Sequence, residues 1–252
     1  MVTFSVLNWA AWAPGLHERE AWKAWARAPF LPCGDDAPLL TEVPSLQRRR
    51  IDRLGRMAIQ TAYWCQGQAG DGSVPLLFAS RHGDVARSVA LLKTLAAGEA
   101  LSPTAFGLSV HNAIAASHSI ISGGRGNYQA LAGGCSTAEA ACVEAVGLLA
   151  DGAPEVKLVC YEAPLPQDLA RYVDEPQAFY AWCWQIAPVG RGGTRLQLNW
   201  SEGGGRQMTI AKRDNDLLPH DLDVHRFLLS GDAALSLSDG AVTWHWHRHD
   251  TP

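Results

Sequence analysis

The sequence predicts a layered α/β fold for residues 1–163, followed by a β-rich part over residues 164–252. In the first part, segments rich in strand-forming residues alternate with segments whose apolar residues recur at helical spacing. This alternation is typical of a mixed sheet covered by buried helices. The chain has 252 residues, 47% of them hydrophobic, and no long linker. We therefore expect one domain, 1–252, with a single large core.

Each element of the first part rests on a local pattern. Residues 3–9 favour a strand that ends at a turn around Pro14 and Gly15. Apolar residues recur from Ile51 to Ala62 at helical spacing, which predicts an amphipathic helix over 47–65. The same reasoning predicts helices at 18–28, 85–96, 110–122 and 136–150, and strands at 74–79, 126–134 and 156–161.

The second part shows strand patterns with little helix. Strands are expected at 179–187 and 195–200, on either side of a glycine-rich turn near Gly192. A short helix at 219–230 and two closing strands within 233–247 complete the chain.

Composition excludes several classes of function. A net charge of −4 and a pI near 6.1 give no general reason to bind nucleic acid or an anionic membrane. The N-terminus lacks the basic region of a signal peptide, and no apolar run reaches the roughly 18 to 20 residues of a membrane span. We expect a cytoplasmic protein. The six cysteines form no CxxC pair, so we expect reduced thiols, no metal and no cofactor.

The most informative short segment surrounds Cys135. A strand of small residues passes through Gly133 and Gly134 into Cys135, which opens a helix. This is the layout of a nucleophile elbow, and the free backbone N–H groups of a helix start favour a thiolate. The alternative is a cysteine that only packs well, as free cysteines commonly do.

Three segments together resemble a known family. They are residues 80–85 (SRHGDV), residues 101–113 (LSPTAFGLSVHNA) and the Cys135 segment with Glu144 and Ala145 after it. This pattern resembles the N-terminal half of β-ketoacyl synthases of the thiolase superfamily. In particular, it resembles the short, chain-length-factor-like proteins of aryl polyene pigment pathways. The resemblance covers residues 1–163 and implies a truncated thiolase-like fold with a β-rich C-terminal extension.

The resemblance places Cys135 at the ketosynthase nucleophile position, which accepts an acyl chain from a carrier-protein thioester. A complete ketosynthase also needs two histidines from its C-terminal half. No TxAHGTGT-like or GFGG-like segment follows residue 163. We therefore expect no condensation by this chain alone, since the acid/base and oxyanion groups are missing. Chain-length-factor-like relatives often have another residue here, so Cys135 is either an acyl-loading residue or a vestige.

Thiolase-like proteins form dimers through the strand before the nucleophile position. The resemblance thus implies a heterodimer with a catalytic ketosynthase, in which this chain shapes the acyl tunnel that limits product length. The implied interface residues are Asn127, Gln129, Ala130, Leu131, Ala132, Gly133 and Gly134. Two alternatives stay open: a stand-alone Cys-dependent acyltransferase or priming enzyme acting on acyl carrier protein, and a homodimeric scaffold without acyl chemistry.

Basic residues cluster within 48–56. Acyl carrier proteins are acidic, so Arg49, Arg50 and Arg53 are candidates for carrier-protein docking. The alternative is a solvated helix face.

Several histidines also invite a function. His245, His247 and His249 alternate with other residues, so on a strand all three would share one face, an arrangement that can bind zinc or copper. They lack a second ligand cluster, which argues against a metal. His111 and His118 are candidate bases for Cys135, but the resemblance places them on a scaffold helix.

Overall fold

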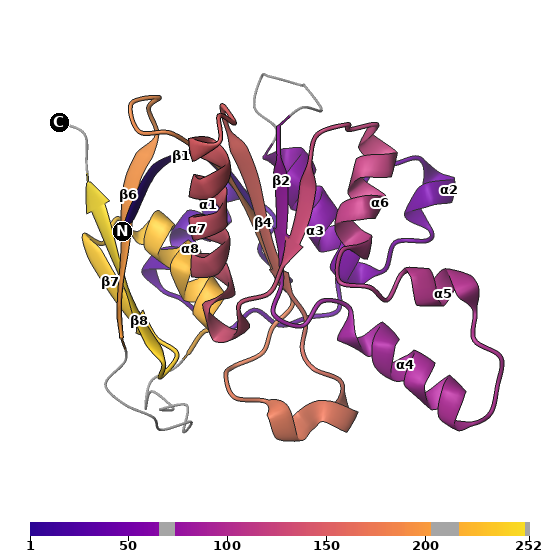
Figure 1. Cartoon of the computed structure of the whole chain (residues 1–252). Helices are drawn as coiled ribbons and strands as arrows, with labels where there is room; N and C mark the ends of the chain where they lie inside the picture. Colours follow the sequence, from indigo (N-terminus) through magenta and orange to yellow (C-terminus); the bar gives the residue numbers. More distant parts are fainter. Residues whose placement is uncertain (66–73, 203–216, 250–252) are drawn as a thin grey trace.

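The computed structural model describes residues 1–65, 74–202 and 217–249, and its centre is a mixed eight-stranded sheet (Figure 1). The strand order is β3-β2-β4-β5-β1-β6-β8-β7. Strand β2 runs parallel to β3 and β4, and all the other neighbours are antiparallel. The strands are β1 (Val2–Trp12), β2 (Leu76–Ala79), β3 (Tyr128–Leu131), β4 (Val156–Glu162), β5 (Tyr180–Ala187), β6 (Thr194–Glu202), β7 (Ala234–Ser238) and β8 (Val242–His249). The predicted α/β class is confirmed.

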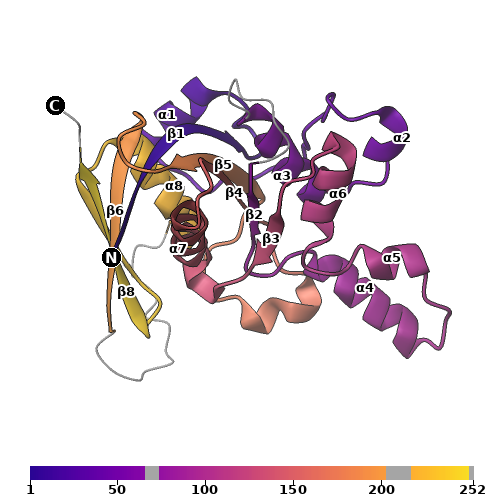
Figure 2. The same ribbon diagram turned by 45° about the horizontal axis from the view of Figure 1, so that its top comes forward.

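Helices cover both faces of the sheet (Figures 1 and 2). Helices α1 (Arg19–Arg27), α7 (Thr137–Ala150) and α8 (His220–Ser230) pack on one face. Helices α3 (Arg53–Trp64) and α6 (Ala113–Ser122) pack on the other. Within the described ranges, no helix is both long and apolar enough to cross a bilayer.

The central strands are apolar on both faces because both faces are covered. In β4, Leu158 and Cys160 belong to the core under α7, whereas Val159 and Tyr161 belong to the core under α3. All seven residues of β4 and all eight of β5 are buried. This explains why these strands are near-continuous apolar runs rather than alternating ones.

The two halves of the chain share this one sheet. Strands β5 and β6 come from residues after 163, yet they lie on either side of β1, the first strand of the chain. The segment 164–252 therefore completes the centre of the sheet as well as extending its β7 end.

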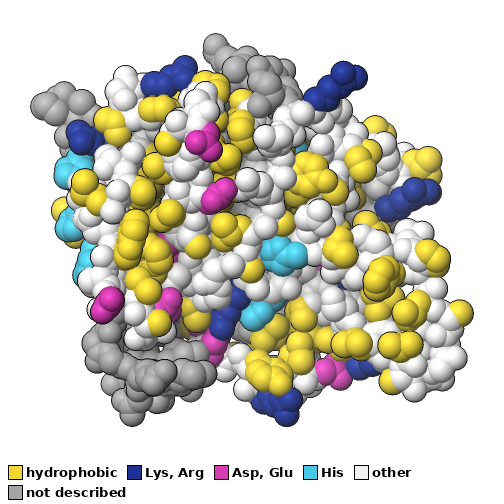
Figure 3. Space-filling model, viewed as in Figure 1, with side chains coloured by type: hydrophobic (Ala, Val, Ile, Leu, Met, Phe, Trp, Pro, Cys, Tyr) yellow, Lys and Arg dark blue, Asp and Glu magenta, His cyan; other side chains and the backbone are white. Residues whose placement is uncertain are grey.

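Residues 85–107 form an arm that extends from the body (Figure 1). The arm contains α4 (Val85–Ala96) and α5 (Pro103–Gly107), and neither helix has a buried residue. Its large apolar side chains are open to solvent: Leu92 is 63% exposed, Leu95 58% and Phe106 60%. Hydrophobic side chains accordingly gather over α4 and α5 on the surface (Figure 3).

The structure differs from the sequence predictions in two helices. The predicted helix 47–65 is divided into α2 (Ser45–Arg48) and α3, because Asp52 accepts a hydrogen bond from Gly55 N (2.8 Å) and caps a new helix start. Helix α5, which begins at Pro103, was not predicted; Ser102 Oγ caps its start by accepting a hydrogen bond from Ala105 N (3.3 Å). The short 3₁₀ segments η1 (Gly134–Ser136) and η2 (Gln167–Tyr172) were also not predicted.

Candidate functional site

The turn around Cys135 has the predicted strand–turn–helix geometry. Cys135 lies in η1, between β3 and the start of α7. Gly134 has a φ of 64°, a left-handed conformation that favours glycine. A Cβ atom on Gly133 would lie 2.9 Å from the Ala140 Cβ atom, which is too close. Both glycines are therefore required for this turn.

The surroundings of the Cys135 thiol oppose ionisation. Burial raises its pKa to about 11, and the carboxylates of Glu175, Asp174 and Asp239 act in the same direction. The Arg81 guanidinium opposes them but does not prevail. The expectation that the helix start favours a thiolate is therefore wrong, since desolvation and the nearby carboxylates outweigh the helix terminus.

Arg81 is bound to acidic groups of its own. Its guanidinium makes two contacts with the Asp174 carboxylate (2.7 and 2.5 Å) and lies 3.5 Å from Glu175 Oε1. Its backbone N–H donates to Glu162, a buried carboxyl whose pKa burial raises to about 8. The guanidinium thus ties the segment before β5 to the end of β2, and its charge is shared among these carboxylates.

A buried His–Glu pair lies at the start of α7, and the sequence did not predict it. His220 Nε2 lies 2.9 Å from Glu139 Oε1, which also accepts from Trp246 Nε1 (3.1 Å). Burial lowers the pKa of His220, but the Glu139 carboxylate prevails and raises it to about 9. Asp221 accepts from Ala138 N (3.0 Å), and burial raises its pKa to about 7. The signal in the sequence was the pair His220 and Asp221 at the start of the predicted helix 219–230.

The other two candidate bases have structural partners. His111 Nε2 lies 2.8 Å from Ser80 O. His118 is buried between the rings of Tyr63 and Phe78, and burial lowers its pKa to about 4. Among the residues that the structure describes, neither histidine forms a hydrogen bond with Cys135. Their geometry is that of scaffold residues.

The predicted interface strand lies at the open edge of the sheet. Within the part of the chain that the structure describes, β3 pairs with β2 and has no strand on its other side. The carbonyl oxygens of Asn127 and Leu131 accept hydrogen bonds from the backbone of β2 and of Ser80, which follows it. Because alternate residues of a strand direct their backbone groups to the same side, those of Gln129 also point to β2. The backbone groups of Tyr128 and Ala130 then face outward, away from β2. Ala132, Gly133 and Gly134 follow β3 into the Cys135 turn.

The basic cluster is not a uniform helix face. Arg49 and Arg50 are exposed, in the turn between α2 and α3. Arg53 is held inside the fold: its guanidinium stacks 3.7 Å from the centre of the Phe179 ring and donates to Gly34 O (2.7 Å). Arg48 and Arg56 donate to backbone carbonyl groups nearby. Of the predicted docking residues, Arg49 and Arg50 are exposed to solvent, as carrier-protein docking requires, and Arg53 is not.

The three C-terminal histidines lie on one strand, β8, and have polar neighbours. His245 lies between Ser201 Oγ (3.2 Å) and Ser236 Oγ (3.0 Å), and His249 is bonded to Gln197 Oε1 (3.0 Å). Trp246, between them in sequence, is fully buried in the core. Over the described part of the chain, no three His, Cys, Asp or Glu side chains are grouped to hold a metal ion.

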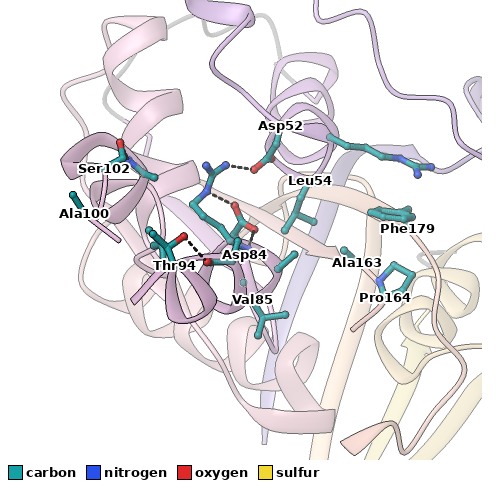
Figure 4. A pocket seen from close by; sticks show the side chains of 17 residues that line it. Asp52, Leu54, Asp84, Val85, Thr94, Ala100, Ser102, Ala163, Pro164 and Phe179 are labelled. Atoms are coloured by element: carbon teal, nitrogen blue, oxygen red, sulfur yellow. Dashed lines mark hydrogen bonds and ion pairs between the residues drawn. The ribbon is translucent and has the colours of Figure 1, made fainter. Parts of the chain in front are cut away.

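A cavity of about 560 Å³ separates the arm from the body (Figure 4). Arm residues such as Val85 form one wall, and Leu54, Ala163 and Phe179 of the body form the other. Arg87 joins the two walls: its Nε donates to Asp84 Oδ2 (2.6 Å) and its Nη2 to Asp52. No motif in the sequence predicted this cavity.

The chain was compared with known proteins. No curated protein matches it. Among solved structures, a chain of the complex of a ketosynthase (ApeO) with its chain length factor (ApeC) from Xenorhabdus doucetiae is 24% identical. The TM-score is 0.80, and the match covers 98% of this chain and 100% of that one. The ishigamide ketosynthase/chain length factor is 12% identical, with a TM-score of 0.72 and coverage of 98% and 99%.

Another solved structure matches over a smaller share of its length. The β-ketoacyl synthase from Burkholderia phymatum is 12% identical, with a TM-score of 0.58; the match covers 83% of this chain and 66% of that one. The sequence profile of the family described as "Beta-ketoacyl synthase, N-terminal domain" matches residues 22–247, about nine-tenths of the chain. By this match, the chain belongs to the β-ketoacyl synthase N-terminal domain family.

Proposed function

We propose that this chain is a chain-length-factor-like subunit that pairs with a catalytic β-ketoacyl synthase. In this role it would help to shape the acyl tunnel during carrier-protein-bound polyene or fatty-acyl-type synthesis. The similarity to chains of ketosynthase/chain length factor complexes extends over the whole of both chains. That similarity supports the choice of partner.

The observation that carries the proposal is the arm. Neither of its helices buries a residue within this chain, although Leu92, Leu95 and Phe106 are large and apolar. A soluble monomer seldom leaves such a contiguous apolar face uncovered. The open edge of β3 adds unpaired backbone groups, which a second strand can bind. A partner that covers both features would bury the apolar side chains of the arm and form hydrogen bonds with the backbone groups of β3.

The state of Cys135 supports a subunit that does not condense alone. A neutral thiol is a poor nucleophile, and burial raises the pKa of Cys135 to about 11. Among the described residues, no histidine hydrogen-bonds to it, and His220 is committed to Glu139. The chemistry would then come from the partner subunit. Cys135 is a vestige in this proposal.

Carrier-protein docking is a further part of the proposal, and it rests on two of the three arginines. Arg49 and Arg50 are exposed and can attract an acidic carrier protein. Arg53 would act indirectly, because its stacking on Phe179 fixes the start of α3 beside them.

Co-expression with a candidate catalytic ketosynthase tests the pairing. We expect a 1:1 complex in size-exclusion chromatography with light scattering. Leu92→Glu combined with Leu95→Glu should weaken the complex at least tenfold, whereas Val189→Glu, an exposed apolar position in the β5–β6 turn, should not. Separate elution of the two wild-type proteins at micromolar concentration would refute the pairing. A stable homodimer that excludes the ketosynthase would favour the scaffold alternative.

A further inference from the structure

The cavity between the arm and the body is lined mainly by apolar side chains. Val85 and Leu91 belong to α4, and they face Leu54, Ala163 and Phe179 across the space. In Figure 4, Val85, Leu54 and Phe179 border the same opening, and each comes from a different part of the chain. Its volume of about 560 Å³ lies within the usual range for small-molecule sites, roughly 300 to 1,000 Å³.

The charged groups of the lining leave no net charge for an ionic ligand. Two carboxylates, Asp52 and Asp84, face two guanidinium groups, Arg53 and Arg87. Arg87 is bonded to both carboxylates, and Arg53 is stacked on Phe179. A phosphate or carboxylate ligand would have to displace these contacts, which makes such a ligand unfavourable.

The two hydroxyl groups of the lining each make a hydrogen bond to the nearby backbone. The Thr94 hydroxyl donates to Ala90 O (3.1 Å), and Ser102 Oγ accepts from Ala105 N (3.3 Å). Arg53 Nε is a buried donor that has no hydrogen-bond partner among the described residues, and it suits a neutral oxygen acceptor. The chemistry of the cavity therefore selects an uncharged, mainly apolar molecule.

The cavity lies at the carboxyl ends of β2 and β4, where Gly83 and Ala163 follow these parallel strands. Ligands of open α/β sheets bind preferentially at this edge. The arm forms one wall, and the outer side of the arm is the apolar face that the partner is proposed to cover. The cavity therefore lies beside the surface that the partner is proposed to cover.

We propose that this cavity binds the apolar distal part of the acyl chain, as an uncharged hydrocarbon or polyene segment. The proposal rests on the proposed function for the source of the chain. The walls come from this subunit alone, so the isolated chain should already bind such a molecule.

The probe is 1,6-diphenylhexatriene, an uncharged aryl polyene that fluoresces strongly only in apolar surroundings. We expect saturable binding of one probe per chain, both to the isolated chain and to its complex with the ketosynthase. Ala163→Phe fills the cavity from the body and Ala105→Phe from the arm. Each should weaken probe binding at least tenfold. Ala96→Phe is the matched control, since Ala96 is exposed on the same arm and does not line the cavity. It should change binding less than twofold.

Ala163→Phe and Ala105→Phe lie on opposite walls, so a folding defect caused by one of them would not explain the loss of binding in both. Circular dichroism shows whether each variant is folded. Equal loss with all three variants would place the probe on the exposed arm and overturn the proposal, as would absent or non-saturable binding to the wild type. If the variants form the ketosynthase complex but retain full probe binding, the cavity proposal fails while the pairing stands. If the wild type binds the probe but never the ketosynthase, the pairing fails instead.

Discussion

Cys135 differs from a catalytic cysteine in its protonation state. With a pKa of about 11, roughly one thiol in 3,000 is ionised at pH 7.5. We expect alkylation by iodoacetamide about two orders of magnitude slower than for a free thiol, and faster as the pH rises towards 11. Peptide mass spectrometry resolves Cys135 from the exposed Cys33, which serves as an internal standard.

The same residue decides between a subunit and a stand-alone acyltransferase. Incubation with acyl carrier protein thioesters should leave the intact mass of the isolated chain unchanged. An acyl adduct that Cys135→Ala abolishes would contradict this expectation and restore the acyltransferase alternative.

The buried groups at the start of α7 make stability depend on pH. Burial raises the folded-state pKa of Asp221 from 3.8 to about 7, so its burial becomes more costly as the pH rises from 4 to 7. The folded-state pKa of His220 is raised from 6.5 to about 9, so its stabilising contribution is complete below pH 6.5 and is lost towards pH 9. Both effects lower the stability as the pH rises.

Urea denaturation at pH 5, 7 and 9 separates the two groups. The wild type should lose stability over both intervals. Asp221→Asn should reduce the loss between pH 5 and 7, and Glu139→Gln should reduce it between pH 7 and 9, since Glu139 raises the pKa of His220. The buried Glu162, whose pKa is raised to about 8, accounts for a loss that remains in both variants. A wild-type midpoint that rises from pH 5 to 9 would show that the assigned directions are wrong.

At the level of single residues, the sequence predicted the turn around Cys135 but not the charged groups that surround its thiol. The two glycines and the following helix are local features, and local patterns predict them. The carboxylates that raise the pKa of Cys135 come from positions 174, 175 and 239. Only the tertiary fold brings them together, so no spacing rule could have found them.

Among the elements, β3 offers the sharpest test of the dimer geometry. Ala130→Pro removes a backbone N–H that faces the open edge and leaves the pairing with β2 in place. Proline is tolerated on edge strands for this reason. One lost backbone hydrogen bond together with altered strand packing should weaken ketosynthase binding about tenfold, corresponding to about 1.4 kcal/mol. Titration calorimetry measures the affinity directly.

The control for this substitution is Ala130→Ser, which keeps the N–H group and should bind like the wild type. An Ala130→Pro variant that folds normally and binds with unchanged affinity would exclude β3 from the interface.

The elements also show where periodicity alone misleads. The apolar spacing starts only at Ile51, so the predicted helix 47–65 wrongly included the turn at 49–52, and the Asp52 cap marks the true helix start. Helix α4 was predicted correctly from Val85, Val89 and Leu92, but its apolar face is not buried in this chain. Periodicity identifies an apolar face without identifying what covers it.

For the whole molecule, we expect one cooperative unfolding transition. One sheet joins both parts of the chain, and Trp246 of β8 is fully buried against Phe4, Trp184 and Phe227. Trp246→Ala should therefore cost about 3 to 5 kcal/mol of unfolding free energy. Trp200→Ala, at a position 45% exposed, should cost less than about 1 kcal/mol.

Urea unfolding followed by both tryptophan fluorescence and far-UV circular dichroism provides the measurement. Two separate transitions, with Trp246→Ala affecting only one of them, would show that residues 164–252 fold as an independent unit.

The position of β1 has a consequence for synthesis on the ribosome. Val2–Trp12 is translated long before its two neighbours in the sheet, Tyr180–Ala187 and Thr194–Glu202. The nascent polypeptide must therefore carry an unpaired apolar strand until these two segments have been translated. Premature termination before about residue 200 would release a fragment with that strand still lacking both of its neighbours, a species that chaperones or proteases would have to remove.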